Sequence, residues 1–169
     1  DSSAYQVQVV CLGNICRSPM AEAILQQKFD DAGLHSKVRV TSSGTSRFNA
    51  GKDMDPRART VLEQHGYTAT HQSRTINPDT VGSYDLTLVM DHENLDDVTE
   101  LFNGAPVNMR LFSAFDPESQ PDAEIPDPYR GTPQDFEEAF ISIERASTAI
   151  VDAVRAGLPA SLPAESVGP

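Results

Sequence analysis

The sequence contains few cysteines, no excess of positive charge and no long apolar run. Its two cysteines, Cys11 and Cys16, lie close together near the N-terminus. A secreted domain held by disulfides carries more cysteines, spread along the chain. Two sulfurs without a nearby pair of histidines cannot complete a tetrahedral zinc site. The thiols are therefore either buried apolar groups or reactive groups in a reducing compartment, and the cytoplasm is the expected location.

The charge is strongly negative, with 13 Lys and Arg residues against 25 Asp and Glu residues and a formal net charge of -12. Nucleic acids and anionic membranes attract basic surfaces, so neither is an expected partner. No apolar run approaches the length that crosses a bilayer. Residues 1–6 have neither the basic nor the apolar region of a signal peptide. Export without a signal peptide remains open.

Length and composition indicate one globular domain. A chain of 169 residues has the usual size of a single domain, and 38% hydrophobic with 22% charged residues is ordinary for a soluble protein. We expect residues 1–156 to form the domain. Residues 157–169 contain several prolines and glycines, and we expect them to form a disordered tail.

Short apolar strands alternate with amphipathic helices along the chain. Strands are predicted near residues 7–11, 38–42, 84–90 and 107–112, and helices near 19–32, 55–65, 94–102 and 136–154. Ser18 is the expected N-cap of the first helix, with Pro19 at its first position. This order predicts a single α/β domain with a four-stranded parallel sheet flanked by helices, Rossmann-like or flavodoxin-like. Ligands bind at the carboxyl ends of such strands, so the loop after the first strand is the natural site.

Cys11 and Arg17 lie at the two ends of this loop, with five residues between them. Successive backbone N–H groups in a tight loop before a helix form a concave anion site, to which the helix dipole adds positive potential. Gly13 lets the backbone curl, and the planar guanidinium of Arg17 can bind two phosphate oxygens at once. The same field favours a thiolate at Cys11. A thiolate in a phosphate cradle is a nucleophile directed at phosphorus, and it needs no adjacent histidine.

A plainer interpretation is that Cys11 ends a buried strand and that Gly13 and Asn14 form an ordinary turn. The bare spacing Cys-x5-Arg would favour this interpretation, because two fixed positions occur often by chance. The strand before the loop, the helix start after it and the Gly-Asn pair inside it favour a functional loop instead.

The sequence resembles the low-molecular-weight protein tyrosine phosphatases over most of its length, from about Val7 to Phe140. The strongest match is Val-Cys-Leu-Gly-Asn-Ile-Cys-Arg-Ser-Pro-Met-Ala-Glu at residues 10–22. Shorter matches follow in the order and spacing typical of that family: Ser43-Gly44-Thr45, Asp55-Pro56-Arg57-Ala58, His65-Gly66, Met90-Asp91, Asp127-Pro128-Tyr129, Gly131 and Asp135-Phe136-Glu137.

The resemblance implies a role for each residue of the loop. In this family the loop cysteine attacks phosphorus and forms a cysteinyl-phosphate that water hydrolyses, so Cys11 takes that role. Arg17 would bind the phosphoryl oxygens and stabilise the transition state. Ser18 would donate to the thiolate, and Asn14 would hold the loop backbone together with Ser43 and His71. The phosphate would be bound by Leu12, Gly13, Asn14, Ile15, Cys16, Arg17 and Ser18. No cofactor and no metal are implied.

The resemblance also implies a general acid. Asp127, in the motif Asp-Pro-Tyr, would protonate the leaving phenolate and then act as base toward the attacking water. Pro128 restricts the backbone of Asp127 and stiffens the loop. By composition alone Asp127 is an ordinary member of an acidic stretch with Asp122 and Glu124. The motif around Asp127 favours the catalytic role.

The resemblance also implies four residues that would line the substrate pocket. Phe48 lies where the family has an aromatic residue, and with Tyr129 it would form a deep slot that fits phosphotyrosine and leaves phosphoserine short of the nucleophile. Taken alone, Phe48 is equally compatible with a core position. Ile15 resembles the tyrosine-directed members, because relatives acting on phosphoarginine carry Thr there. Arg130 stands where many members have a second tyrosine, and it would favour acidic phosphopeptides.

The expected partners are phosphotyrosyl proteins or peptides, phosphate and similar oxyanions are expected ligands, and the protein is expected to be a monomer. Cys16 would capture oxidised Cys11 as a reversible disulfide, or would simply be a buried apolar residue.

The alternative function is arsenate reduction on the same fold. The thioredoxin-linked kind needs further cysteines, and none follows Cys16. A kind that uses an external thiol remains open, although Asp127 would then lack a purpose. A module that only binds phosphotyrosine is disfavoured, because Cys11, Arg17 and Asp127 are all present.

Overall fold

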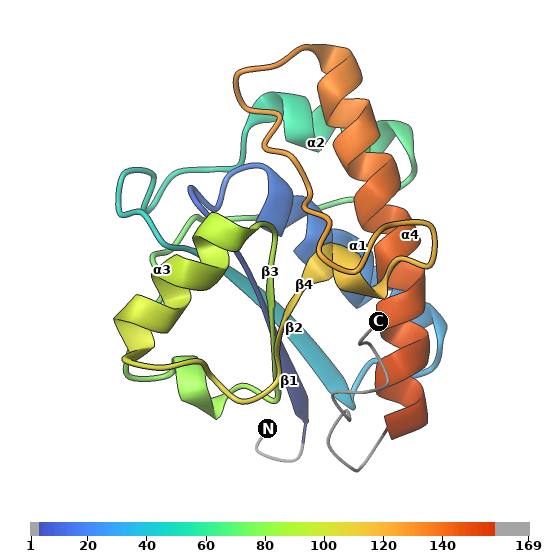
Figure 1. Cartoon of the computed structure of the whole chain (residues 1–169). Helices are drawn as coiled ribbons and strands as arrows, with labels where there is room; N and C mark the ends of the chain where they lie inside the picture. The colour runs from blue at the N-terminus through green and yellow to red at the C-terminus, as the bar shows by residue number, and fades with distance from the viewer. Residues whose placement is uncertain (1–3, 158–169) are drawn as a thin grey trace.

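A four-stranded parallel sheet runs through the centre of the protein, seen in a computed structural model that describes residues 4–157 (Figure 1). The strands lie in the spatial order β2-β1-β3-β4, and every neighbouring pair is parallel. Their bounds are β1 (Tyr5–Cys11), β2 (Val38–Gly44), β3 (Leu86–Val89) and β4 (Met109–Leu111). The predicted α/β class and four-stranded parallel sheet are confirmed.

Four α-helices cover the two faces of the sheet (Figure 1). Helices α1 (Arg17–Asp31) and α4 (Pro133–Gly157) pack against each other on one face, and α2 (Pro56–Gln64) contacts both of them. Helix α3 (His92–Phe102) lies on the opposite face. Two short 3-10 turns, η1 (Val81–Ser83) and η2 (Phe112–Phe115), precede β3 and follow β4.

The side chains of β1 alternate between two apolar clusters. Val7 and Val9 are fully buried in the large core shared with α1 and α4. Val10 faces the other side of the sheet and packs in a smaller cluster with Val89 of β3 and Val98 of α3. Burial on both faces explains why the apolar residues of β1 include the direct neighbours Val9 and Val10.

The carboxyl ends of three strands meet at one edge of the sheet. Cys11 pairs with Gly44 at the end of β2, and Val10 pairs with Val89 at the end of β3. The loop between β1 and α1 starts at this edge, as predicted. The N-terminus of α3 starts there too, because His92 follows closely after β3.

Helix α1 begins two residues earlier than predicted. Its N-cap is Cys16 and its first residue is Arg17, so the prediction of Ser18 as N-cap is wrong. No side chain caps this helix. The hydroxyl of Ser18 instead approaches the sulfur of Cys11, which leaves the amides at the start of α1 available to a ligand.

The other boundaries differ by a few residues. Asp55 caps α2 as predicted, with Pro56 at the first position. Helix α3 begins two residues before the prediction, because Asp91 and Asn94 form a capping box. Strand β4 is shorter than predicted, and Val107 lies outside it with 82% of its surface exposed. Among residues 4–157, no helix combines the length and apolar character that a membrane span requires. The predicted tail, apart from Gly157, lies outside the described residues.

Candidate active site

The loop between β1 and α1 presents a row of backbone amides. Asn14 has a left-handed backbone with φ of 56°, a conformation that asparagine tolerates better than most residues. Within residues 4–157, the N–H groups of Ile15, Cys16 and Arg17 have no hydrogen-bond acceptor. They lie at the start of α1, where the helix dipole adds positive potential. This arrangement can bind an anion that has several oxygens.

The sulfur of Cys11 is buried and receives hydrogen bonds from the loop. The backbone N of Asn14 lies 3.2 Å from Sγ, and Oγ of Ser18 lies 3.0 Å from it. Donors directed at a sulfur stabilise the thiolate more than the neutral thiol. The loop therefore directs two hydrogen-bond donors at the sulfur of Cys11.

Asn14 attaches the loop to the segment that follows α2. Its side-chain Oδ1 accepts a hydrogen bond from the backbone N–H of Arg74 at 2.9 Å. Its carbonyl oxygen accepts from Nε2 of His71 at 2.8 Å and from Oγ of Ser73 at 2.6 Å. Since Oδ1 faces Arg74, the amide nitrogen Nδ2 points the other way, toward the hydroxyls of Ser18 and Ser42.

The direction of the Ser18 hydrogen bond follows from this orientation. Nδ2 of Asn14 donates to Oγ of Ser18 at 2.8 Å and to Oγ of Ser42 at 3.0 Å. Ser18 therefore accepts from Asn14 and keeps its own proton for another partner. The nearer acceptor is Sγ of Cys11 at 3.0 Å, whereas the carbonyl oxygen of Ser43 is 3.5 Å away. The hydroxyl of Ser18 is thus a donor to the sulfur.

The hydroxyl from β2 in this network belongs to Ser42, whereas Ser43 was predicted. Ser42 donates onward to Oε1 of Glu22 at 2.6 Å. The hydroxyl of Ser43 bonds Gln8 at 3.0 Å, and only its carbonyl approaches the network. Adjacent strand residues face opposite sides, and the sequence alone could not show which serine faces the loop. Ser73 was also missed, because nothing in its irregular segment marks it as a partner of the loop.

The end of β2 approaches the loop too closely for any side chain. A Cβ atom at Gly44 would lie 2.7 Å from the carbonyl oxygen of Leu12 and 3.0 Å from the backbone N of Asn14. Backbone atoms cannot move aside as a flexible side chain could, so this position requires glycine. The next residue, Thr45, donates its N–H to the carbonyl of Cys11 at 3.0 Å. The loop is therefore held along its β2 side.

Arg17 is almost fully buried and links three segments. Its Nη1 donates to Asp91 at 2.7 Å and to the carbonyl of Ile125 at 2.8 Å, and its Nη2 lies 3.6 Å from Oδ2 of Asp127. Burial disfavours the charged form, but Cys11, Asp91 and Asp127 together raise the pKa of Arg17 above its ordinary value. The guanidinium is therefore a fixed positive charge beside the sulfur.

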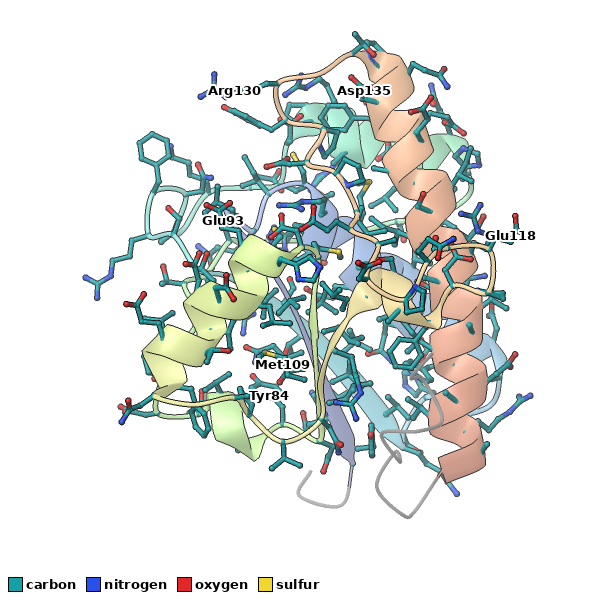
Figure 2. All side chains as sticks on the ribbon, in the orientation of Figure 1. Tyr84, Glu93, Met109, Glu118, Arg130 and Asp135 are labelled. Carbon is teal, nitrogen blue, oxygen red and sulfur yellow. The ribbon has the colours of Figure 1, made fainter. Side chains whose placement is uncertain are left out.

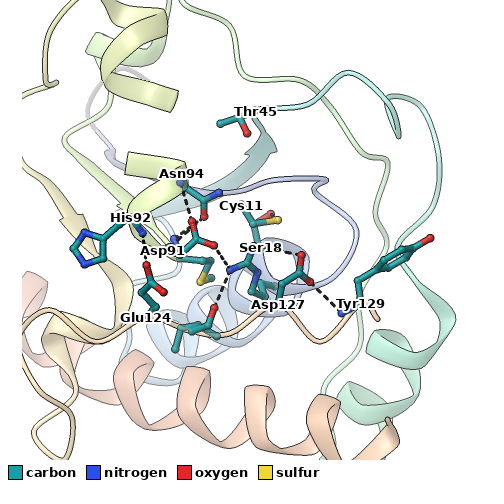
Figure 3. Close-up of polar contacts among 12 residues, drawn as sticks. Cys11, Ser18, Thr45, Asp91, His92, Asn94, Glu124, Asp127 and Tyr129 are labelled. Carbon is teal, nitrogen blue, oxygen red and sulfur yellow. Dashed lines mark hydrogen bonds and ion pairs between the residues drawn. The ribbon is translucent and has the colours of Figure 1, made fainter. Parts of the chain in front are cut away.

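Asp91 was not among the predicted site residues. It holds the guanidinium with one oxygen and accepts the N–H of Asn94 with the other, at 2.8 Å. Its neighbour His92 donates its N–H to Glu124 at 2.8 Å, which attaches the segment before Asp127 to the start of α3 (Figure 3). The sequence signal for Asp91 was its position as an N-cap between a strand and a helix.

Asp127 lies at the boundary between the buried loop and solvent, with 41% of its side chain exposed. Its Oδ1 accepts the N–H of Tyr129 at 3.1 Å, which orients the carboxylate (Figure 3). The carbonyl of Tyr129 accepts from Nη2 of Arg57 at 2.9 Å, and Arg57 pairs with Asp55 at 2.9 Å. Asp55 donates its N–H to the carbonyl of Ile15 at 2.8 Å. One chain of contacts thus connects the Asp127 segment to the loop.

A cavity of about 580 Å³ opens over the loop. It is lined by Cys11, Leu12, Gly13, Ile15, Cys16, Arg17, Ser46, Phe48, Asn49, Asp127, Tyr129 and Arg130. The predicted nucleophile, general acid and four pocket residues therefore share one cavity. Phe48 is 80% exposed and Tyr129 47% exposed, so the aromatic residues stand at the entrance and the sulfur lies at the buried end.

Cys16 is buried in the same loop, and both cysteines are free thiols. Burial raises the pKa of Cys16 well above its ordinary value, and Asp55, Asp127 and Cys11 raise it further. Cys16 is therefore a neutral thiol at neutral pH, and Cys11 is the cysteine whose sulfur receives hydrogen bonds from Asn14 and Ser18. The disulfide between the two stays a prediction.

A family model described as low molecular weight phosphotyrosine protein phosphatase matches residues 6–160. The chain belongs to this family. The match spans the sheet, the cysteine loop and helix α4, so membership rests on nearly the whole fold of this phosphatase family and not on the loop motif alone.

Individual members of the family agree in sequence and in fold. A low molecular weight protein-tyrosine-phosphatase of Streptomyces coelicolor is 39% identical over 157 residues, which cover 89% of this chain and 94% of the relative. A crystal structure of a protein tyrosine phosphatase from Entamoeba histolytica superposes with a TM-score of 0.84 at 27% identity, covering 91% of this chain and 99% of that one. An arginine phosphatase of Drosophila superposes with a TM-score of 0.80 at 28% identity, covering 88% and 97%.

Proposed function

We propose that the protein hydrolyses phosphotyrosine through a cysteinyl-phosphate intermediate, with Cys11 as the nucleophile. One observation carries the proposal: a sulfur that receives hydrogen bonds from Asn14 and Ser18 lies at the end of a cavity that also contains Arg17 and Asp127. Membership of the phosphatase family supports the same reaction.

In the first step the amides at the start of α1 and the guanidinium of Arg17 bind the non-bridging oxygens of the phosphoryl group. Sγ of Cys11 attacks phosphorus, so that an S–P bond forms as the bond from phosphorus to the tyrosyl oxygen breaks. Asp127, in its protonated form, transfers its proton to that oxygen, and tyrosine leaves as a neutral phenol. The negative charge that builds up on the phosphoryl oxygens is met by donors already in place.

In the second step a water molecule attacks the phosphorus of the cysteinyl-phosphate. The carboxylate of Asp127 takes a proton from that water, and the S–P bond breaks. Cys11 leaves as a thiolate, which the hydroxyl of Ser18 stabilises through the 3.0 Å contact. Inorganic phosphate is released, one water has been consumed, and both catalytic groups have returned to their starting forms.

The shape of the cavity supports an aryl phosphate as substrate. Cys11 is 3% exposed, whereas Phe48 at the entrance is 80% exposed, so a phosphate must pass from the surface to a buried position. The long, flat side chain of phosphotyrosine can span this path between Phe48 and Tyr129. The shorter side chain of phosphoserine would leave its phosphate away from Cys11. Ile15 in the lining supplies an apolar contact for the ring.

The deciding experiment is to trap the intermediate by rapid quenching of a phosphotyrosine reaction and to locate the phosphate by mass spectrometry. We expect one phosphoryl group on Cys11, none in Cys11→Ser, and retention of the Cys11 adduct in the matched variant Cys16→Ser. Turnover by Cys11→Ser, or phosphate on another residue, would contradict the mechanism. Phosphoarginine, and arsenate with an external thiol, are tested in parallel, and faster turnover of either would replace the assignment. No structural observation favours arsenate reduction, and both cysteines of the chain lie in the one loop.

A further inference from the structure

Two positively charged side chains border the cavity entrance without a carboxylate partner. Arg130 lines the cavity and projects from the segment that leads to α4, away from the sheet (Figure 2). In the segment that follows β2, Nζ of Lys52 lies 4.8 Å from the ring centroid of Phe48, which lines the cavity. Both side chains are exposed, and neither forms an ion pair within residues 4–157.

Two other cations near the entrance are already paired. Arg57 binds Asp55 at 2.9 Å, and Arg59 binds Asp53 at 2.7 Å. These pairs neutralise the two carboxylates that follow Lys52 in the chain. Lys52 and Arg130 have no such pair and are still available to a ligand.

The position of these charges contrasts with the charge of the whole molecule. The chain has a formal net charge of -12, which repels a multiply phosphorylated or acidic ligand at long range. An unpaired Arg that lines the cavity, and an unpaired Lys that contacts the lining residue Phe48, therefore oppose the overall field at that place. They stand outside the loop that binds the phosphate, so they would meet the residues on either side of the phosphotyrosine.

We propose that Lys52 and Arg130 select phosphotyrosyl segments with Asp or Glu on both sides of the phosphotyrosine. This inference rests on the proposed phosphotyrosine hydrolysis and names its substrate class. A phosphotyrosine placed between Phe48 and Tyr129 directs its backbone across the entrance, with one flank on the side of Lys52 and the other on the side of Arg130. Neighbouring residues of an extended segment are about 3.3–3.6 Å apart. A carboxylate one to three residues from the phosphotyrosine can therefore approach either cation.

The test compares three synthetic phosphotyrosyl peptides with acidic, neutral and basic flanks. For the unmodified protein we expect kcat/KM in the order acidic, neutral, basic. Each exposed ion pair should contribute about 1.5- to 5-fold to the ratio of acidic to neutral peptide. Arg130→Gln and Lys52→Gln should each remove one such factor. The preference should also weaken with added salt, because exposed charges are screened.

The double variant gives the sharpest result. With both cations removed, only the negative field of the whole molecule remains, so the ratio should fall to one or below. Lys37→Gln is the matched control, because Lys37 is also exposed and changes the net charge equally, but precedes β2 at the opposite end of the sheet from Cys11. Lys37→Gln should leave the ratio of kcat/KM for the acidic and neutral peptides unchanged.

The outcomes separate this inference from the proposed function. Hydrolysis of the neutral peptide and of p-nitrophenyl phosphate without preference for acidic flanks, or an unchanged ratio in the double variant, would overturn the inference alone. An equal loss in Lys37→Gln would also overturn it, because net charge would then account for the preference. Failure of the unmodified protein to hydrolyse every one of these substrates would instead overturn the proposed function.

Discussion

The catalytic loop, residues 11–18, and the entrance, residues 45–53 and 127–131, are built in opposite ways. In the loop, Asn14, Arg17 and Ser18 are buried, and each side chain has at least two polar partners. At the entrance, Phe48 and Arg130 are exposed, and few contacts hold their side chains. Groups that stabilise charge in a transition state must be fixed in advance, whereas groups that meet a peptide can adjust to it.

The difference implies that substitutions act differently in the two regions. A buried donor or acceptor that loses its partner costs free energy of folding, so loop substitutions should reduce stability and turnover together. Substitutions of exposed entrance residues should change substrate binding and leave stability nearly unchanged. Measuring both quantities for each variant tests the comparison.

Asp127 lies where the two regions meet, and its replacement should have the largest effect. Asp127→Asn removes the proton donor, so kcat should fall by roughly 10²–10⁴-fold for phosphotyrosine. The fall should be much smaller for p-nitrophenyl phosphate, whose leaving group needs less protonation. Steady-state kinetics with both substrates measures this difference. Asp122→Asn, in the same acidic stretch, is the control, and an equal fall there would contradict the role of Asp127.

Asn14→Ala should damage both stability and turnover. It removes the donors to Ser18 and Ser42 and puts alanine at a φ of 56°. We expect the free energy of unfolding to fall by about 2–4 kcal/mol. Because the sulfur loses its fixed surroundings, kcat should fall by about 10- to 100-fold. Urea unfolding and steady-state kinetics provide the two measurements.

Asn103 supplies the matched comparison for Asn14. It has a similar left-handed backbone, with φ of 63°, but it is exposed at the end of α3. Asn103→Ala should cost about 1 kcal/mol for the backbone alone and leave kcat as it was. If the two variants lost equal stability and activity, the Asn14 network would have no specific effect.

Phe48→Ala should affect binding without affecting stability. Stacking of an aromatic pair contributes about 0.5–1.5 kcal/mol, so KM for phosphotyrosine should rise by about 2- to 10-fold with little change in kcat. Val107→Ala is the control, since Val107 is 82% exposed and lies away from the cavity. Its KM should not change. A Tm lowered by Phe48→Ala would show that Phe48 supports the fold and would weaken the contrast.

The smallest expected effect concerns the link between the two regions. Burial opposes the charge of Asp55, but hydrogen bonds from Arg57 lower the pKa of Asp55 below its ordinary value. A lowered folded-state pKa stabilises the protein above the unfolded-state pKa, and this stability is lost as pH falls through the folded-state value. Asp55→Asn keeps a capping oxygen and removes the charge.

We therefore expect Asp55→Asn to lower the free energy of unfolding by about 0.5–1 kcal/mol at pH 7, because its partner Arg57 is partly exposed. In strong acid the difference from the unmodified protein should disappear. Urea unfolding at both pH values measures it. Asp53→Asn, which breaks the more exposed pair with Arg59, should cost less at pH 7. A difference for Asp55→Asn that stayed constant with pH would exclude the charge as its cause.

Much of the fold could be predicted because its signals are local. The apolar, β-branched composition of β1, the Asp55-Pro56 start of α2 and the apolar stripe of α4 each depend on residues close together in sequence. The errors arose where tertiary contacts compete with local preference. Ser18 has the sequence context of an N-cap, yet its hydroxyl serves Cys11, and the helix starts at Arg17.

The cysteine loop itself was determined by the sequence. An apolar strand, a glycine-asparagine turn and a helix start bring Cys11 and Arg17 to the two ends of one loop, because all these residues are neighbours along the chain. The identity of the nucleophile follows from that local order. The residues that surround it do not.

The tertiary structure decided which groups orient the loop and close the cavity. Asn14 bonds Ser42, which is 28 residues away, and Arg17 bonds Asp91 and the carbonyl of Ile125, which are 74 and 108 residues away. These contacts depend on the order and register of the strands, which bring the ends of β1, β2 and β3 to one edge. Local sequence patterns contain no such register, and it becomes defined only when the buried faces of the sheet pack.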